Sequence, residues 1–123
     1  MALHDSLRPV PDLRVLVTAG GNGIGATIVR AFHAAGAQVH VCDIDRAALD
    51  RLLKEAPGLT GTPADASVSS DVDNVFEGVR NHLGGLDVLV SNAGIAGPTA
   101  PIDEIEPAHW ARTLAVNLDS QFH

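Results

Sequence analysis

A short apolar run that leads directly into a cluster of glycines most constrains how this chain can fold. Residues 13–25 read L-R-V-L-V-T-A-G-G-N-G-I-G, and residues 15–17 are apolar and rich in the β-branched valine that is typical of strands. Glycine tolerates positive φ, so the cluster indicates a tight turn after the strand. Apolar residues then recur at helical spacing, at Ile24, Ile28, Phe32 and Ala35. The segment therefore predicts a strand, a turn and a helix in succession.

The glycine cluster also indicates a phosphate site. Backbone N–H groups at the start of a helix lack partners inside the helix and carry partial positive charge. A glycine run by itself is weak evidence, because many loops are rich in glycine simply to turn. Here a second apolar segment, 39–42, ends on Asp43, twenty residues after Gly23. At that spacing a βαβ unit brings a carboxylate to the ribose 2′-hydroxyl of NAD, so the context predicts a dinucleotide site.

The alternation of strands and helices continues along the chain. Asp45 is placed to cap a helix that Pro57 and Gly58 end, and residues 59–63 form a third, weaker strand. A helix follows whose apolar residues are Val68, Val72, Val75, Phe76, Val79 and Leu83, and Gly84 stops it. Residues 86–90 are almost uninterruptedly apolar, as expected of a strand covered on both faces. One face of a last helix carries Trp110, Leu114, Asn117 and Leu118, and we expect this face to point inward.

This order predicts an α/β fold with a doubly wound parallel sheet, a three-layer Rossmann-type domain of about four strands. The strands are expected in the spatial order third, second, first, fourth. We expect a single domain over residues 13–123, preceded by an N-terminal extension at residues 1–12. The fourth strand lacks the prolines and charges that protect natural edges. We therefore expect the domain to be incomplete at its C-terminus, with a further segment covering that strand.

Composition excludes several classes of function. The net charge is −7 and Lys54 is the only lysine, so a nucleic-acid partner is not expected. No run approaches the roughly 18 apolar residues of a membrane span, and the first residues lack the apolar core of a signal peptide, so we expect a cytoplasmic protein. Cys42 is the only cysteine and ends an apolar strand, which favours a buried thiol. The six histidines show no metal-ligand spacing, so no metal is expected.

With these motifs in chain order, the sequence resembles the short-chain dehydrogenase/reductase family over nearly its whole length. Residues 18–25 are similar to the family's T-G-x-x-x-G-x-G, with Ala19 where the first glycine usually stands. Residues 91–94 read S-N-A-G, close to the family's N-N-A-G, and the A-V-N-L segment carries the helix asparagine. Gly21, Gly23 and Ala26 also satisfy the G-x-G-x-x-A pattern of other Rossmann enzymes. The S-N-A-G segment favours the short-chain dehydrogenase/reductase pattern over this G-x-G-x-x-A pattern.

The resemblance implies a set of cofactor-binding residues: Thr18, Gly20, Asn22, Gly23, Ile24, Gly25, Asp43, Ile44, Asp65, Ala66, Asn92, Ala93 and Gly94. It places Asp65 against the adenine amino group. Asp65 and Asn92 could instead only form turns, and Asp43 could cap a helix, although Asp45 can supply that cap. A carboxylate at Asp43 would repel the 2′-phosphate of NADP, so NAD is expected. Arg46 leaves NADP open, because it is near enough in sequence to reach such a phosphate.

The resemblance implies hydride transfer between nicotinamide and a carbonyl or secondary alcohol. Asn117 is the one catalytic position present, implied to hold a water that links a catalytic lysine to solvent. The chain contains no tyrosine, so the family's Y-x-x-x-K is absent, and we expect a dinucleotide-binding half that is inactive alone. Truncation, a frameshift or a separate chain could account for the remainder. The alternative is a non-catalytic nucleotide-binding or interaction module; in either case we expect a homo-oligomer.

Overall fold

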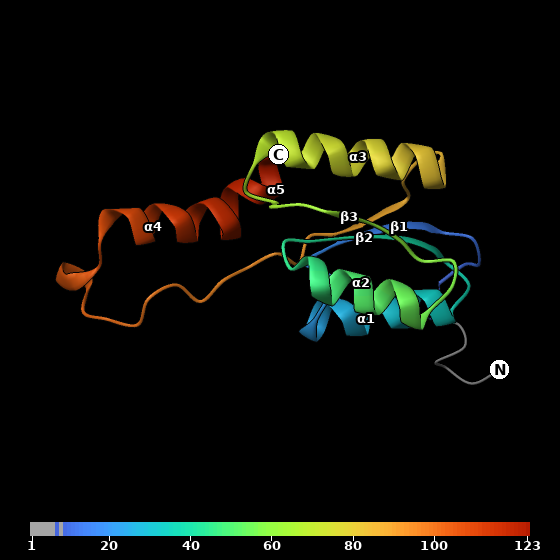
Figure 1. Ribbon diagram of the computed structural model, residues 1–123, viewed down its shortest axis with the longest axis horizontal. Helices are drawn as coiled ribbons and strands as arrows, with labels where there is room; N and C mark the ends of the chain where they lie inside the picture. Colours follow the sequence, from blue (N-terminus) through green and yellow to red (C-terminus); the bar gives the residue numbers. More distant parts are fainter. Residues whose placement is uncertain (1–6, 8) are drawn as a thin grey trace.

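The computed structural model describes residue 7 and residues 9–123, and shows a parallel sheet with helices on both faces (Figure 1). Its four strands are β1 (Arg14–Thr18), β2 (Gln38–Asp43), β3 (Thr60–Pro63) and β4 (Val88–Val90), in the order β3-β2-β1-β4. All three neighbouring pairs are parallel. The doubly wound Rossmann-type fold and the strand order are therefore confirmed. Most of the extension expected at residues 1–12 lies outside the described residues.

Three helices cover the sheet, and local signals explain where they begin and end. Figure 1 shows α1 (Gly23–Ala34) and α2 (Arg46–Glu55) on one face and α3 (Ser69–Leu83) on the other. The side chain of Asp45 accepts a hydrogen bond from the amide of Ala48 at 3.0 Å, so the predicted cap of α2 is confirmed. Gly84 ends α3 in the left-handed conformation, with φ of 74°, which glycine adopts without strain.

The sheet divides the core into two layers, because alternate residues of a strand point to opposite faces. Toward α1 and α2 the buried residues include Val15, Val17, Val29, Val39, Val41, Leu49 and Leu52. Toward α3 they are Leu16, Cys42, Ala64, Val75 and Val79. Cys42 is 2% exposed, so its predicted burial is confirmed, and this burial raises the pKa of its thiol to about 11.

One histidine is part of this core. His40 is completely buried in β2, and its two ring nitrogens lie 2.6 Å and 2.9 Å from the hydroxyls of Thr60 and Thr62 in the neighbouring strand. Its ring stacks on His82 of α3 with 5.6 Å between centroids. Burial, together with the neighbouring His82, lowers the pKa of His40 to about 4, so this side chain is neutral at pH 7.

The predicted burial of the fourth strand was wrong. Its apolar run indicated cover on both faces, yet Leu89 is 50% exposed and its neighbours Val88 and Val90 are only partly buried. β4 pairs with β1 along one side, and within the described part of the chain no strand lies on its other side. An apolar run records a tendency to be covered; it does not show that the same chain supplies the cover.

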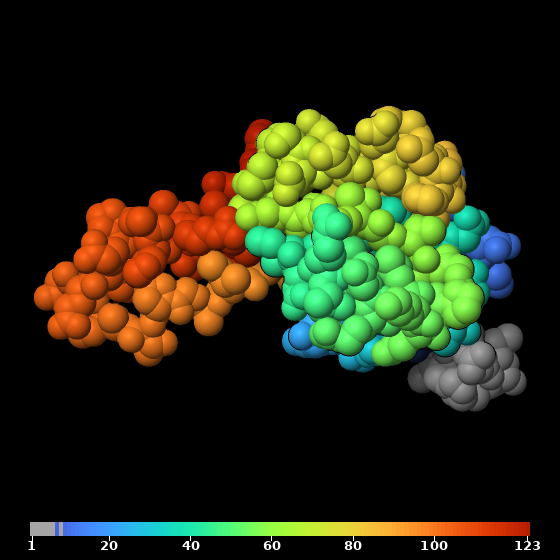
Figure 2. Space-filling model, in the orientation of Figure 1, coloured from blue at the N-terminus to red at the C-terminus, as the bar shows by residue number. Residues whose placement is uncertain are grey.

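About the last quarter of the chain, residues 91–123, forms an arm (Figures 1 and 2). Its loop and the helix that follows extend away from the sheet, whereas its C-terminal end lies against the body, with His123 near the carbonyl of Ala66. Its helical part comprises α4 (Pro107–Leu114), a π-helical turn (Ala115–Asp119) and α5 (Ser120–Phe122). The expected inward face was wrong in part, since Trp110, Leu114 and Leu118 are 54%, 42% and 62% exposed. Val116 is buried instead. The apolar spacing identified one helix face, but packing turned a different face toward the body.

None of the helices in the described part of the chain is both long and apolar enough to cross a membrane.

Candidate functional site

The carboxyl ends of the four parallel strands meet at one edge of the sheet. β1 leads into the glycine loop, β2 ends at Asp43, β3 is followed by Asp65, and β4 leads into residues 91–94. The chain winds outward from β1 to β2 and β3, then returns to place β4 on the other side of β1. In open α/β sheets, ligands bind in the crevice beyond the strands at such a reversal.

The glycine loop needs glycine at two positions for different reasons. Gly23, at the start of α1, has φ of 53°, and a Cβ there would meet no atom within 4 Å. Gly25 is buried, and a Cβ there would lie 2.6 Å from the side-chain nitrogen of Asn92. Asn22 precedes Gly23 and accepts a hydrogen bond from its amide at 2.9 Å, so it caps α1. The asparagine directly before the helix was a signal for this cap.

Ala19 adopts the conformation that glycine would supply. Its φ is 50°, in the left-handed region that costs about 1–2 kcal/mol for a residue with a Cβ. The departure from the family pattern therefore places an alanine with positive φ at this point of the loop.

Asp43 holds the glycine loop to the end of β2. Its side chain is only slightly exposed, and its Oδ2 accepts a hydrogen bond from the amide of Gly21 at 2.9 Å. Its Oδ1 accepts from the amide of Asp45 at 2.8 Å. A carboxylate has about four acceptor positions, so Asp43 retains capacity for ligand hydroxyls. The alternative in which Asp43 caps α2 is excluded, because Asp45 does so.

Asn92 connects the end of β4 to the same loop. Its side-chain nitrogen donates to the carbonyls of Thr18 and Ala19, both at 3.2 Å. The hydroxyl of Thr18 in turn accepts hydrogen bonds from the amides of Asn92 and Ala93, at 2.9 Å and 3.0 Å. Asn92 is therefore more than a turn residue, since it couples two strand ends on either side of the crevice.

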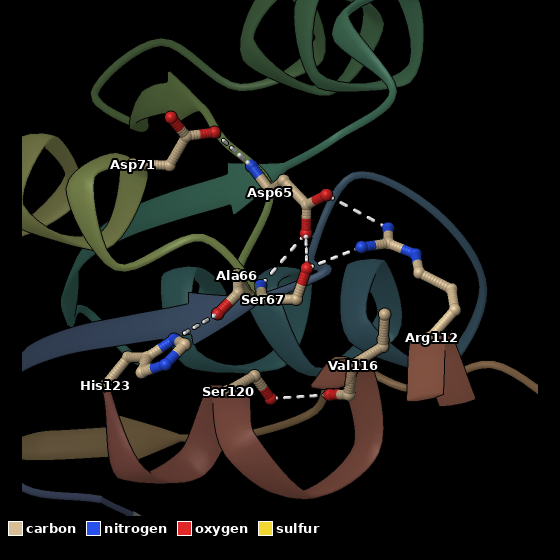
Figure 3. A network of polar contacts seen from close by, with 8 residues as sticks. All are labelled: Asp65, Ala66, Ser67, Asp71, Arg112, Val116, Ser120 and His123. Atoms are coloured by element: carbon tan, nitrogen blue, oxygen red, sulfur yellow. Dashed lines mark hydrogen bonds and ion pairs between the residues drawn. The ribbon is translucent and has the colours of Figure 1, made fainter. Parts of the chain in front are cut away.

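Asp65 belongs to a network that the sequence did not reveal (Figure 3). Its Oδ1 accepts from both the amide and the hydroxyl of Ser67, at 2.9 Å and 2.6 Å, so the turn expected as an alternative is present. Its Oδ2 pairs with Arg112 of α4 at 3.0 Å. Arg112 also donates to the hydroxyl of Ser67 at 2.6 Å. Arg112 lies 47 residues from Asp65, and no sequence signal links two residues so far apart.

Asn117 lies in the π-helical turn and bonds to the arm's own loop. Its Oδ1 accepts from the amide of Ile95, and its side-chain nitrogen donates to the carbonyl of the same residue, both at 2.8 Å. π-helical turns are rare and occur frequently at functional sites. The amide is half-buried and satisfied, as expected of an inward-facing asparagine.

Several of the expected residues line one pocket of about 100 Å³ between the sheet edge and the arm. They are Asp43, Ile44, Asp65, Ala66, Ala93 and Gly94, joined by Ala19, Cys42, Ala64, Ile95, Arg112 and Val116. The remaining expected residues, Thr18, Gly20, Asn22, Gly23, Ile24, Gly25 and Asn92, do not line it and lie in the adjoining glycine loop and strand ends. Within the described residues, no group of three or more His, Cys, Asp or Glu side chains could hold a metal ion.

Known proteins share this sequence pattern. The family model described as short chain dehydrogenase matches residues 14–123. The short chain dehydrogenase/reductase dpchG of Colletotrichum higginsianum is 37% identical over 107 residues, which cover 84% of this chain and 40% of that protein. The L-fucose dehydrogenase of Bos taurus is 38% identical over 104 residues, covering 85% of this chain and 38% of that protein. This chain thus spans less than half the length of these relatives.

Solved structures share the fold. The crystal structure of 3-ketoacyl-(acyl-carrier-protein) reductase from Brucella melitensis, complexed with NADH, superposes with a TM-score of 0.89 at 30% identity. The match covers 93% of this chain and 47% of that one. Since the family model matches residues 14–123, almost the whole sequence, this chain belongs to the short chain dehydrogenase family.

Proposed function

We propose that residues 13–123 bind NAD at the carboxyl edge of the sheet and supply the dinucleotide-binding part of an oxidoreductase of the short-chain dehydrogenase type. The observation that carries this proposal is the hydrogen bond between Asp43 Oδ2 and the amide of Gly21. This hydrogen bond joins the carboxylate proposed to bind the ribose to the loop proposed to bind the phosphates, beside the crevice. The thirteen cofactor-binding residues expected from the sequence remain the proposed contacts.

The residues present fit a dinucleotide. Gly23 presents open space and positive φ at the start of a twelve-residue helix, where backbone amides favour an anion. Asp43 and Asp65 retain acceptor positions for hydroxyl and amino donors. When bound, the nicotinamide would donate or accept a hydride. The chain's own residues would hold the diphosphate, orient the ribose and adenine, and set the face that the nicotinamide presents.

This chain alone is proposed to be inactive toward carbonyls and secondary alcohols. A positioned general acid or base contributes about 10²–10⁴-fold to such a step, and the sequence contains no tyrosine to serve as one. Asn117 is proposed to contribute only when the other catalytic groups are supplied. Its side chain holds the loop at Ile95, which keeps the π-helical turn in place.

A matched pair of glycine substitutions tests the phosphate loop. Gly23 and Gly84 both have positive φ, and a Cβ at either position would meet no atom within 4 Å. Gly23→Ala and Gly84→Ala therefore introduce similar strain, of about 1–2 kcal/mol. We expect similar losses of melting temperature, but only Gly23→Ala should weaken NAD binding in calorimetric titration, by at least about tenfold. Equal NAD affinity in the two variants, or no NAD binding by the unmodified chain, contradicts the proposal.

The preference for NAD is tested separately. Asp43→Asn keeps one side-chain oxygen but removes the charge that repels a 2′-phosphate, so it should narrow the gap between NAD and NADP affinities. Arg46 is exposed at the first position of α2, and Arg46→Met tests whether it attracts NADP. Equal affinities of the unmodified chain for the two dinucleotides would contradict the preference. An NADP affinity that disappears in Arg46→Met would assign the alternative cofactor.

A second candidate function is a non-catalytic module that associates with itself. Trp110, Leu114, Leu118 and Phe122 recur every four residues along the arm helix and are 42–91% exposed. An exposed apolar stripe of this kind is typical of an interaction surface. We expect sedimentation analysis to show a homo-oligomer that Leu118→Glu converts to monomers while NAD binding persists. A monomeric unmodified chain contradicts this candidate.

A further inference from the structure

Arg112, Ser67 and Asp65 form a closed ring of hydrogen bonds between α4 and the loop after β3 (Figure 3). Arg112 donates from Nη2 to Asp65 and from Nη1 to Ser67, and the hydroxyl of Ser67 donates to the other oxygen of Asp65. Rotation of the Asp65 carboxylate would break bonds on both of its oxygens. The ring therefore fixes the orientation of this carboxylate.

Counting the contacts of the described residues, one acceptor position of Asp65 is unused. Of about four acceptor positions on a carboxylate, Ser67 takes two on Oδ1 and Arg112 takes one on Oδ2. The Asp65 side chain is 21% exposed, and both Asp65 and Arg112 line the pocket between the sheet edge and the arm. The free position on Oδ2 can therefore accept one donor from a ligand in that pocket.

The same contacts keep the carboxylate ionised. Burial acts to raise the pKa of Asp65, but the hydrogen bonds from Ser67 and the ion pair with Arg112 outweigh it and lower the pKa below the ordinary value. An ionised carboxylate only accepts hydrogen bonds, which suits an amino donor. The amide of Asp65 is also held, because it donates to Asp71 at 2.8 Å.

We propose that Arg112 is a positioning residue that aims the Asp65 carboxylate at the amino group of adenine, and so sets the preference of the pocket for adenine over a base without that amino group. This inference rests on the proposed dinucleotide function and deepens it. The alternative is a purely structural role, in which the surface ion pair only holds the arm against the body. The two roles can be distinguished by measurement, because a purely structural role would change the affinities for all dinucleotides by the same factor.

The test compares two ligands that differ at the base. NAD and nicotinamide hypoxanthine dinucleotide, in which an oxygen replaces the adenine amino group, are titrated into the 123-residue chain. We expect NAD to bind about tenfold more tightly, as a hydrogen bond to a charged acceptor provides. Arg112→Met should reduce this ratio to about two or less. Arg112→Lys, which keeps the charge without the two-pronged geometry, should retain an intermediate ratio.

Matched variants separate position from charge and folding. Arg51→Met removes an exposed arginine from α2, which lies on the opposite face of the sheet from α3, and should keep the full ratio. Ser67→Ala opens the ring while leaving the Asp65 ion pair, and should lower the ratio partway. Arg112 is 45% exposed, so its loss should leave the fold intact. If circular dichroism shows that Arg112→Met is unfolded, the affinity ratios measured for Arg112→Lys and Ser67→Ala test the proposal instead.

The outcomes distinguish the two proposals. If the unmodified chain binds neither dinucleotide, the proposed function fails and this inference fails with it. If the unmodified chain binds both equally, or if the Arg112 and Ser67 variants weaken both ligands by the same factor, dinucleotide binding stands and the role of Arg112 is overturned. A ratio that falls in these variants and holds in Arg51→Met supports the inference.

Discussion

The body of the protein, residues 14–90, and its arm, residues 91–123, are stabilised in different ways. Among the residues that the structure describes, every buried hydrophobic one belongs to the body except Val116. The arm is tied on by polar contacts instead, among them Asn92 to Thr18 and Arg112 to Asp65. A hydrogen bond contributes about 0.5–1.5 kcal/mol net, whereas a buried aliphatic side chain contributes about 1.5–3 kcal/mol. The body should therefore be the cooperative folding unit, and the arm the region of lowest local stability.

The two regions also contribute different residues to the candidate site. The body presents the glycine loop, Asp43 and Asp65 on strand ends that are held by the core. The arm closes the pocket with Ile95, Arg112 and Val116. Changes in the body should therefore affect folding, while changes in the arm should affect the pocket and leave the fold in place.

Leucine truncation should give the largest contrast. Leu49, on the buried face of α2, is 1% exposed, and Leu49→Ala should cost about 2–5 kcal/mol in the free energy of unfolding. Leu118 is 62% exposed on the arm, and Leu118→Ala should change that free energy by less than about 0.5 kcal/mol. Urea denaturation followed by circular dichroism measures both. Comparable losses would remove the distinction between body and arm.

Acid should weaken the body through His40. Its pKa is lowered to about 4 in the folded chain, from 6.5, so the folded state prefers the neutral imidazole. The associated stability is present above pH 6.5 and is lost as pH falls toward 4, by about 3 kcal/mol in total. His40→Gln should flatten the pH dependence in this window, while His109→Gln, at an exposed position in the arm, should not. A stability profile of the unmodified chain that is flat between pH 6.5 and 4.5 would refute this assignment.

Asn117 should hold the arm without affecting the body. Asn117→Ala removes both hydrogen bonds to Ile95 and should cost about 1–2 kcal/mol of local stability. Hydrogen exchange should quicken at the amide of Ile95 and stay unchanged at Val41 in the core. Asn74→Ala, on an exposed position of α3, is the matched control and should leave both rates unchanged. Faster exchange at Val41 in Asn117→Ala would mean that arm and body unfold together.

The smallest effect is expected at Ala19. Ala19→Gly relieves the strain of φ at 50° but increases the freedom of the unfolded chain, so the net gain should be at most about 1 kcal/mol. Thermal unfolding should show a modest rise in melting temperature. Ala31→Gly, at an exposed position inside α1, should instead lower it, because glycine weakens a helix interior. A lower melting temperature in both variants would show that glycine at position 19 does not stabilise the loop.

Local patterns predicted much of this fold. Alternating strands and helices gave the strand order, and the cap at Asp45 and the stop at Gly84 were recognisable from single residues. The glycine loop and Asp43 were also identifiable, because each depends on spacing along the chain. Two predictions about burial failed, at Leu89 and on the outer face of the arm helix. Apolar spacing shows which residues share a face, but it carries no information about what covers that face.

Short-range regularities in the chain were enough to specify the order of the elements, their caps and the loop at the strand ends, because each depends on residues within a few positions of one another. The contacts of Asn92 with Thr18, of Arg112 with Asp65 and of Gly21 with Asp43 followed only from the folded chain. These contacts join residues 22–74 positions apart, and their geometry depends on how the sheet brings its strand ends together. The pocket exists because of that convergence.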